Sequence, residues 1–302
     1  MTPAWIGLCV FLGANPLVRP ATNVRPLEPV SFRMAGPTTT SRASACVATR
    51  DFQICCCGSN VDPQPVAETC ERLRRQLRQI WFQADDDCTW SPRCQVVVHP
   101  TLESYVRQLG PGSEGTSGCS SIELDSGRVV VRRIDLRADA EGWLTESLPH
   151  ELTHVVLADR FSSRRIPRWA DEGLAILAES VEKQQLRERT WLAESRAGMQ
   201  FNARDLFAVD APPPSNRHNA FYGQSASLVR FLIEQGTPGR FMGFVEATQQ
   251  HGSVKALQET YGFDSVEHLQ QLWASRRPVP NGSILLADRK PTVEKSEAVS
   301  TD

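Results

Sequence analysis

Two histidines four residues apart are the part of this sequence best suited to chemistry. The segment 148–157 reads Leu-Pro-His-Glu-Leu-Thr-His-Val-Val-Leu and contains His150, Glu151 and His154 in the pattern H-E-x-x-H. On a helix, residues four apart differ by only about 40° in direction and about 6 Å in rise, so both imidazoles can face one ion. Glu151 lies about 100° round the helix from His150. The pattern predicts a Zn²⁺ site with His150 and His154 as ligands and Glu151 as general base.

The residues around this motif favour a buried helix. Ser147 is expected to cap its start, and Pro149 is tolerated in a first helical turn. The residues that follow His154 are apolar, as a buried helix requires. The alternative is coincidence, in which two core or surface histidines happen to lie four residues apart.

A third ligand is needed, because catalytic zinc takes three protein ligands and keeps one position for water. Pro167 should end any helix that reaches it, and a second helix is expected from about Arg168. Glu172 lies in the first turns of that helix and is the predicted third ligand, with Asp171 as its rival by position. Glu179, seven residues further on, either holds a histidine ring as an outer carboxylate or is an ordinary solvated glutamate.

Together the two segments resemble the gluzincin metallopeptidases, which include thermolysin-like and aminopeptidase-like enzymes. The residues 150–154 read as in thermolysin, and Trp-Ala-Asp-Glu-Gly-Leu-Ala at 169–175 is similar to the glutamate helix of the aminopeptidases. The resemblance is strongest over about residues 145–180 and extends weakly to about 276. It implies His150, His154 and Glu172 as zinc ligands and Glu151 as catalytic base. The G-x-M-E-N motif that binds a substrate's free amino terminus is absent, so aminopeptidase activity is not implied.

The oxyanion of peptide hydrolysis needs a hydrogen-bond donor besides the metal. The gluzincin resemblance implies a Tyr or His from the helical second half of the chain. Tyr222 is the predicted catalytic donor, and His218 is the second candidate. The alternative for Tyr222 is a tyrosine packed in the core.

Length and composition indicate a globular protein with a sizeable core. The 302 residues are 40% hydrophobic and 23% charged, with a formal net charge of −2, which allows one large domain or two small ones. So small a net charge gives no electrostatic reason to expect a nucleic-acid partner. No apolar run reaches the roughly 18–20 residues of a stable membrane span. The gluzincin resemblance implies a peptide or protein substrate as the partner.

The N-terminal segment and the cysteines both indicate export. Residues 1–18 are the predicted signal segment, because 4–14 form an apolar run of suitable length, although no Lys or Arg precedes it. Eight of the nine cysteines lie between Cys46 and Cys119, ahead of the zinc motif. Such clustering is typical of a disulfide framework made in an oxidising compartment. We therefore expect a secreted or periplasmic protein, with Cys88–Cys94 as the favoured single disulfide.

The periodicity of apolar residues predicts both strands and helices. The gluzincin resemblance implies an α+β fold, in which a small mixed sheet packs on the zinc-binding helix and an all-helical C-terminal part follows. The expected domains are a disordered linker (19–48), a cysteine-rich α+β front half with an edge strand (49–144), the zinc-binding and C-terminal helices (145–277) and a disordered tail (278–302). Front-half elements are expected as a strand within 49–58, a helix at 66–83, a strand at 94–99, a helix at 102–109 and a loop at 110–121. Further helices are expected at 181–196, 221–234, 238–249, 254–261 and 265–275.

The strongest strand prediction is 128–136, within the segment 121–139. It lies just before the zinc-binding helix, where the resemblance implies the edge strand that pairs with an extended substrate. Strand addition, in which backbone groups bind the peptide, is the physical basis of that role. The alternative is an ordinary interior strand.

The predicted function is hydrolysis of peptide bonds by a zinc metallopeptidase. One alternative is a catalytically inactive relative that keeps zinc for stability and acts as a binding module. Glu151 argues against that alternative, because a purely structural site has no use for a general base. The other alternative is a metal-dependent hydrolase of a non-peptide amide or ester, since the same chemistry would serve it.

Overall fold

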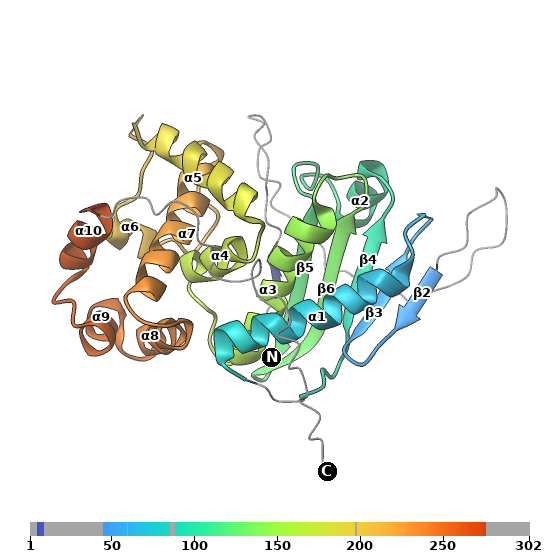
Figure 1. Cartoon of the computed structure of the whole chain (residues 1–302), viewed down its shortest axis with the longest axis horizontal. Coiled ribbons are helices and arrows are strands. Elements are labelled where there is room, and N and C mark those ends of the chain that lie inside the picture. Colours follow the sequence, from blue (N-terminus) through green and yellow to red (C-terminus); the bar gives the residue numbers. More distant parts are fainter. Residues whose placement is uncertain (1–4, 9–44, 59, 85–87, 197, 276–302) are drawn as a thin grey trace, which may run out of the picture.

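A mixed sheet and a set of helices lie side by side in this protein (Figure 1). The computed structural model describes residues 5–8, 45–58, 60–84, 88–196 and 198–275. The sheet has six strands in the order β1-β5-β6-β4-β3-β2, and the C-terminal part is helical. The predicted α+β fold class is therefore confirmed. The expected tail at 278–302 and most of the expected linker fall outside the described residues.

The sheet combines parallel and antiparallel pairs. β3, β4 and β6 run parallel. β2 pairs antiparallel with β3, β5 pairs antiparallel with β6, and β1 pairs antiparallel with β5. The parallel pair β3–β4 requires a crossover, and helix α1 (Pro63–Phe82) lies between these two strands in the chain. The strands are β1 (Trp5–Leu8), β2 (Ala45–Ala48), β3 (Phe52–Cys56), β4 (Cys94–His99), β5 (Gly118–Asp125) and β6 (Arg128–Arg137). The linker prediction was thus wrong at its end, because residues 45–48 pair with β3.

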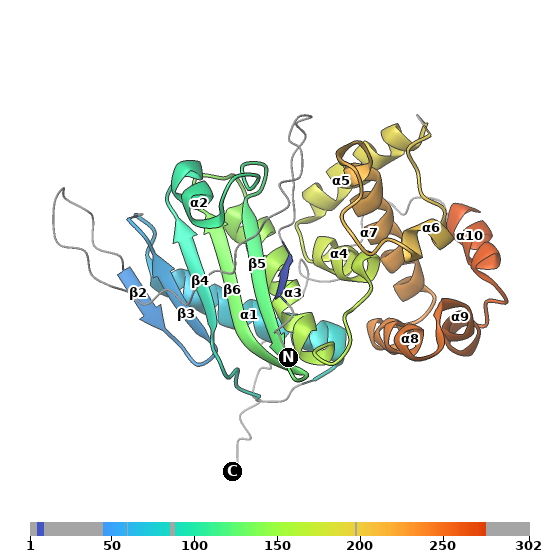
Figure 2. The same ribbon diagram turned by 180° about the vertical axis from the view of Figure 1, so that it is seen from behind.

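One face of the sheet carries the core of this half. Ile54, Val96 and Ile134 lie next to one another on neighbouring strands, and each is fully buried. Helices α1 and α3 (Leu148–Arg160) cover the sheet (Figure 1). Helix α2 (Leu102–Leu109) lies at the upper end of the strands when the molecule is seen from behind (Figure 2). The zinc-motif helix is α3, so its position is set by the sheet beneath it.

The helical part is built on a close contact between α4 and α7. A Cβ added to Gly173 would lie 2.5 Å from Val229 Cγ2 and 2.7 Å from the Ser225 backbone oxygen, so this glycine permits the close approach. No helix of the described residues is long and apolar enough to cross a bilayer. The helices are α4 (Arg168–Leu177), α5 (Val181–Arg196), α6 (Ala203–Phe207), α7 (His218–Glu234), α8 (Pro238–His251), α9 (Ser253–Tyr261) and α10 (Val266–Ser275).

The strand predicted at 128–136 is confirmed as β6, and the wider segment around it is a β-hairpin. β5 and β6 are joined by a turn in which Ser126 (φ 51°) and Gly127 (φ 77°) both have positive φ, as a two-residue hairpin turn requires. β6 pairs with β4 on one edge and β5 on the other, so the prediction that it is the edge strand was wrong. β5 lies outside it and begins at Gly118, inside the predicted loop. The outer edge of β5 pairs with β1.

Among the described cysteines, the one disulfide joins Cys46 and Cys55. These residues lie directly opposite each other on the antiparallel strands β2 and β3. The predicted Cys88–Cys94 disulfide was wrong, because Cys88 is exposed and Cys94 is buried at the start of β4, with neither in a disulfide. Short sequence separation suggested that pair, whereas the register of two strands sets the observed one.

Candidate metal centre

The zinc-motif helix α3 is buried around its whole circumference from Leu148 to Leu157, as expected of a helix enclosed by other elements. A π-helical turn, Trp143–Ser147, leads into it, and Pro149 lies in its first turn. Ser147 was expected to cap this helix through its side chain, but its Oγ lies 2.7 Å from Ser117 Oγ instead. The hydroxyl therefore ties the helix start to the segment just before β5.

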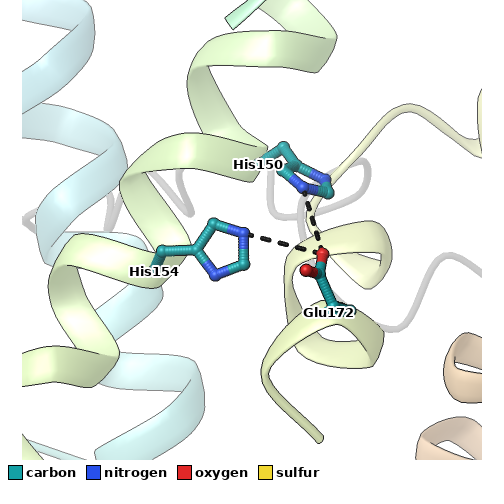
Figure 3. Close-up of side chains that lie close together, drawn as sticks. All are labelled: His150, His154 and Glu172. Atoms are coloured by element: carbon teal, nitrogen blue, oxygen red, sulfur yellow. Dashed lines mark ion pairs between the residues drawn. The ribbon is translucent and has the colours of Figure 1, made fainter. Parts of the chain in front are cut away.

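His150, His154 and Glu172 converge at one point between α3 and α4 (Figure 3). Glu172 Oε2 lies 3.8 Å from His150 Nε2 and 3.9 Å from His154 Nε2. Donor atoms about 2.0–2.1 Å from a tetrahedral zinc ion lie about 3.3 Å apart, so the observed spacing is close to that of a zinc site. The three residues predicted as ligands are thus brought together by the fold.

The ligand atoms themselves fit a metal ion. Among the described residues, His150 Nε2, His154 Nε2 and both carboxylate oxygens of Glu172 are buried without a hydrogen-bond partner. A buried polar atom left without a partner is costly, and such atoms call for an explanation such as an ion. Two imidazole nitrogens and one carboxylate are also the donor set of catalytic zinc sites.

The far nitrogen of each imidazole is held by a carboxylate. His150 Nδ1 lies 2.8 Å from Glu179 Oε1, and His154 Nδ1 lies 2.8 Å from Asp171 Oδ1. With Nδ1–H donating to these oxygens, each Nε2 presents its lone pair to the site. Asp171, the rival ligand by position, therefore lies behind His154. Glu179 is buried and bonded to a ring, rather than being a solvated glutamate.

Arg187 completes the support behind His150. Its guanidinium donates to both oxygens of Glu179, at 2.7 Å from Nε to Oε2 and 2.6 Å from Nη2 to Oε1. Burial alone would raise the pKa of Glu179, but Arg187 and His150 lower it to about 2. Glu179 is therefore an anion that orients His150. Nothing in the charged segment 181–196 singled out Arg187, whose contact with Glu179 forms only when α5 packs against α7.

A second arginine touches Glu172 directly. Arg168 Nη2 lies 3.3 Å from Glu172 Oε1, the oxygen turned away from the two histidines. Arg168 also hydrogen-bonds Tyr222, and burial raises the pKa of that phenol above its usual range. Tyr222 is thus buried near the site as a neutral donor. The second candidate, His218, donates a hydrogen bond of 2.6 Å from Nε2 to the Pro213 carbonyl instead.

Glu151 follows His150 on α3 and lies close enough for its charge to help raise the pKa of His154. It is 1% exposed, and Ser120 Oγ donates a hydrogen bond of 2.8 Å to its Oε2. A Cβ on Gly118 would lie 2.9 Å from Glu151 Cγ, so the side chain packs directly against β5. Ser120 and Gly118 were missed because their surroundings are rich in Gly and Ser, which predicted a loop.

Zinc binding is expected to depend steeply on pH. Burial alone would lower the pKa of His154, but Asp171 and Glu172 raise it to about 9 in the metal-free protein. Zinc binds only the neutral ring and must displace that proton below pH 9. The apparent zinc affinity should therefore rise about tenfold per pH unit from pH 7 and level off near pH 9. Competition with a chelator of known pH dependence measures it, and a flat profile over pH 7–9 would contradict the assignment.

Comparison with known proteins agrees with this geometry. A profile of the peptidase MA superfamily matches residues 127–277, a region of 151 of the 302 residues that contains β6, the zinc motif and the C-terminal helices. No curated protein matches the chain. Because the matched region covers half of the sequence and includes all three converging side chains, the chain belongs to the peptidase MA superfamily.

Proposed function

We propose that this protein is a zinc-dependent peptidase. The observation that carries the proposal is the convergence of His150, His154 and Glu172, with unpartnered buried donor atoms, in a member of the peptidase MA superfamily. Glu151 lies beside these ligands on the same helix and is not needed to hold the ion. A carboxylate that lies next to such a site without being a ligand is what a hydrolase requires.

In this proposal Glu151 is the general base. Zinc, when bound, would polarise the scissile carbonyl and lower the pKa of water. Glu151 accepts a proton from the attacking water and passes it to the leaving amine. Tyr222 is the proposed donor to the oxyanion, and its neutral phenol supports that role. Arg168 contacts both Tyr222 and Glu172, so it links the proposed donor to the proposed third ligand.

The proposed substrate is an extended peptide, and its binding edge is β5 rather than β6. The antiparallel partner already on that edge, β1, sets Leu8 opposite Ser120, and Ser120 contacts Glu151. A peptide could bind this edge by strand addition only in place of β1, whose residues belong to the predicted signal segment 1–18. It would then pass beside the proposed base. In the view from behind, β1 lies between β5 and the helical part of the molecule (Figure 2).

Export is part of the proposal. The Cys46–Cys55 disulfide supports it, because structural disulfides persist in oxidising compartments. The predicted signal segment supports it as well, since its apolar run has the length of a secretory signal. We therefore place the protein outside the cytoplasm, secreted or periplasmic.

The test combines metal analysis with a substrate panel. The purified protein is expected to contain one zinc per chain, to cleave internally quenched peptides, to lose activity on chelation and to recover it when zinc is restored. Mass spectrometry of the products would show which bonds are cut. Zinc binding without any turnover would instead indicate an inactive relative. Turnover of esters or non-peptide amides alone would indicate the other hydrolase class.

A further inference from the structure

The side chain of Glu151 is held by one strand. Ser120 is fully buried, and its Oγ donates to Glu151 Oε2 at 2.8 Å. Two residues earlier, on the same face of β5, the Cβ position of Gly118 lies 2.9 Å from Glu151 Cγ and 3.3 Å from its Oε1. One carboxylate oxygen is thus bonded to a hydroxyl, and the other lies over a residue that has no side chain.

The two oxygens of Glu151 thus have different surroundings, and this difference matters for a general base. A base must present one oxygen to the proton that it takes, and its geometry must be held before the reaction begins. A glutamate side chain has several rotatable bonds, and one charge-assisted hydrogen bond can fix its carboxylate plane. The hydroxyl on β5 supplies that bond, and the bare backbone at Gly118 leaves room for the side chain to lie flat.

We propose that Ser120 is a positioning residue for Glu151, which holds Oε2 so that Oε1 is the oxygen that receives the proton. The inference rests on the proposed function in two respects, the role of Glu151 as base and the binding of the peptide along β5. The same strand then performs two tasks. Its edge binds the peptide backbone and its inner face orients the base, so a peptide on the edge and the carboxylate are placed by one rigid element.

The first measurement is steady-state kinetics of Ser120→Ala. This variant removes only the hydroxyl, so kcat should fall about 10- to 100-fold, as expected for a misplaced catalytic group, while KM and zinc content stay unchanged. Ser121→Ala is the matched control, because successive strand residues face opposite sides of the sheet. It should retain wild-type kcat. Gly118→Ala, which displaces Glu151 by crowding, should also lower kcat without loss of zinc.

The second measurement is a double-mutant cycle. Since Ser120 acts through Glu151, Ser120→Ala should cost nothing further in kcat when Glu151 is already Gln. In the metal-free protein, the shifts in Tm of Ser120→Ala and Glu151→Ala should also be non-additive, because each change alone removes the contact, whereas those of Ser121→Ala and Glu151→Ala should add.

Three results would overturn the inference: wild-type kcat in Ser120→Ala, an equal further loss of kcat in the double variant, or additive shifts in Tm. The unfolding cycle needs no activity, so it tests the Ser120–Glu151 contact even if no peptide is cleaved. A wild-type protein without peptidase activity would refute the proposed function separately.

Discussion

Glu151→Gln is expected to lower kcat by about 10³-fold or more while leaving zinc content unchanged. Gln has the same shape and can still accept the hydrogen bond from Ser120, but it cannot take up the proton of the attacking water. General bases contribute about 10²–10⁴-fold to rates, so the loss should be close to that whole contribution. Zinc is retained because its three predicted ligands, His150, His154 and Glu172, are untouched. Peptide turnover and metal content, measured on the same sample, check both parts.

A nearby carboxylate provides the matched control for this variant. Glu146 lies in the turn before α3, where it accepts a hydrogen bond from Ser180 and pairs with Lys183. Glu146→Gln therefore removes the same charge close to the site without touching Glu151, and it should keep wild-type kcat. Unchanged turnover in Glu151→Gln would discard the assigned mechanism. Loss of zinc in that variant would show that Glu151 is a ligand rather than the base.

The local part of the site could be predicted from sequence, because helix geometry fixes it. His150 and His154 share a face wherever their segment is helical, and the apolar residues that follow them favour a buried helix. The longer helices of the C-terminal part were predicted for the same reason, since periodic apolar residues determine them locally, whereas the five-residue α6 was not predicted. Glu172 was a harder prediction, because its approach depends on the turn at Pro167 and on the packing of α4.

What sequence reasoning missed depends on contacts between distant segments. Ser120 reaches Glu151 only after β5 has packed against α3, and Arg187 reaches Glu179 only after α5 has packed against α7. The edge strand was misassigned for a related reason. A two-residue turn at Ser126–Gly127 divides one polar and apolar stretch into two strands, and the outer strand begins in a Gly- and Ser-rich segment that predicts a loop. Strand order is set by pairing across the sheet, which no local pattern records.

The assignment of the third ligand predicts different effects on zinc affinity for substitutions of the neighbouring carboxylates Glu172 and Asp171. Glu172→Gln is expected to weaken zinc binding by more than about 100-fold, the upper end of what the loss of an outer partner costs. Its Oε2 faces both histidines, at 3.8 and 3.9 Å from their Nε2 atoms. Asp171→Asn should weaken zinc binding by at most about tenfold, because Asn keeps an acceptor for the N–H of His154 and loses only the charge.

Competitive chelator titration at one pH measures the zinc affinity of both variants and so distinguishes the roles of the two carboxylates. Thermal unfolding of the metal-free proteins controls for folding. That control matters because Glu172 also faces the buried Arg168, and an arginine left without its partner destabilises a core. If the Glu172→Gln protein folds and binds zinc as tightly as wild type, Glu172 is not the third ligand. If Asp171→Asn lost zinc instead, the ligand would be Asp171, and α4 would have to turn relative to α3 to bring that carboxylate to the two imidazoles.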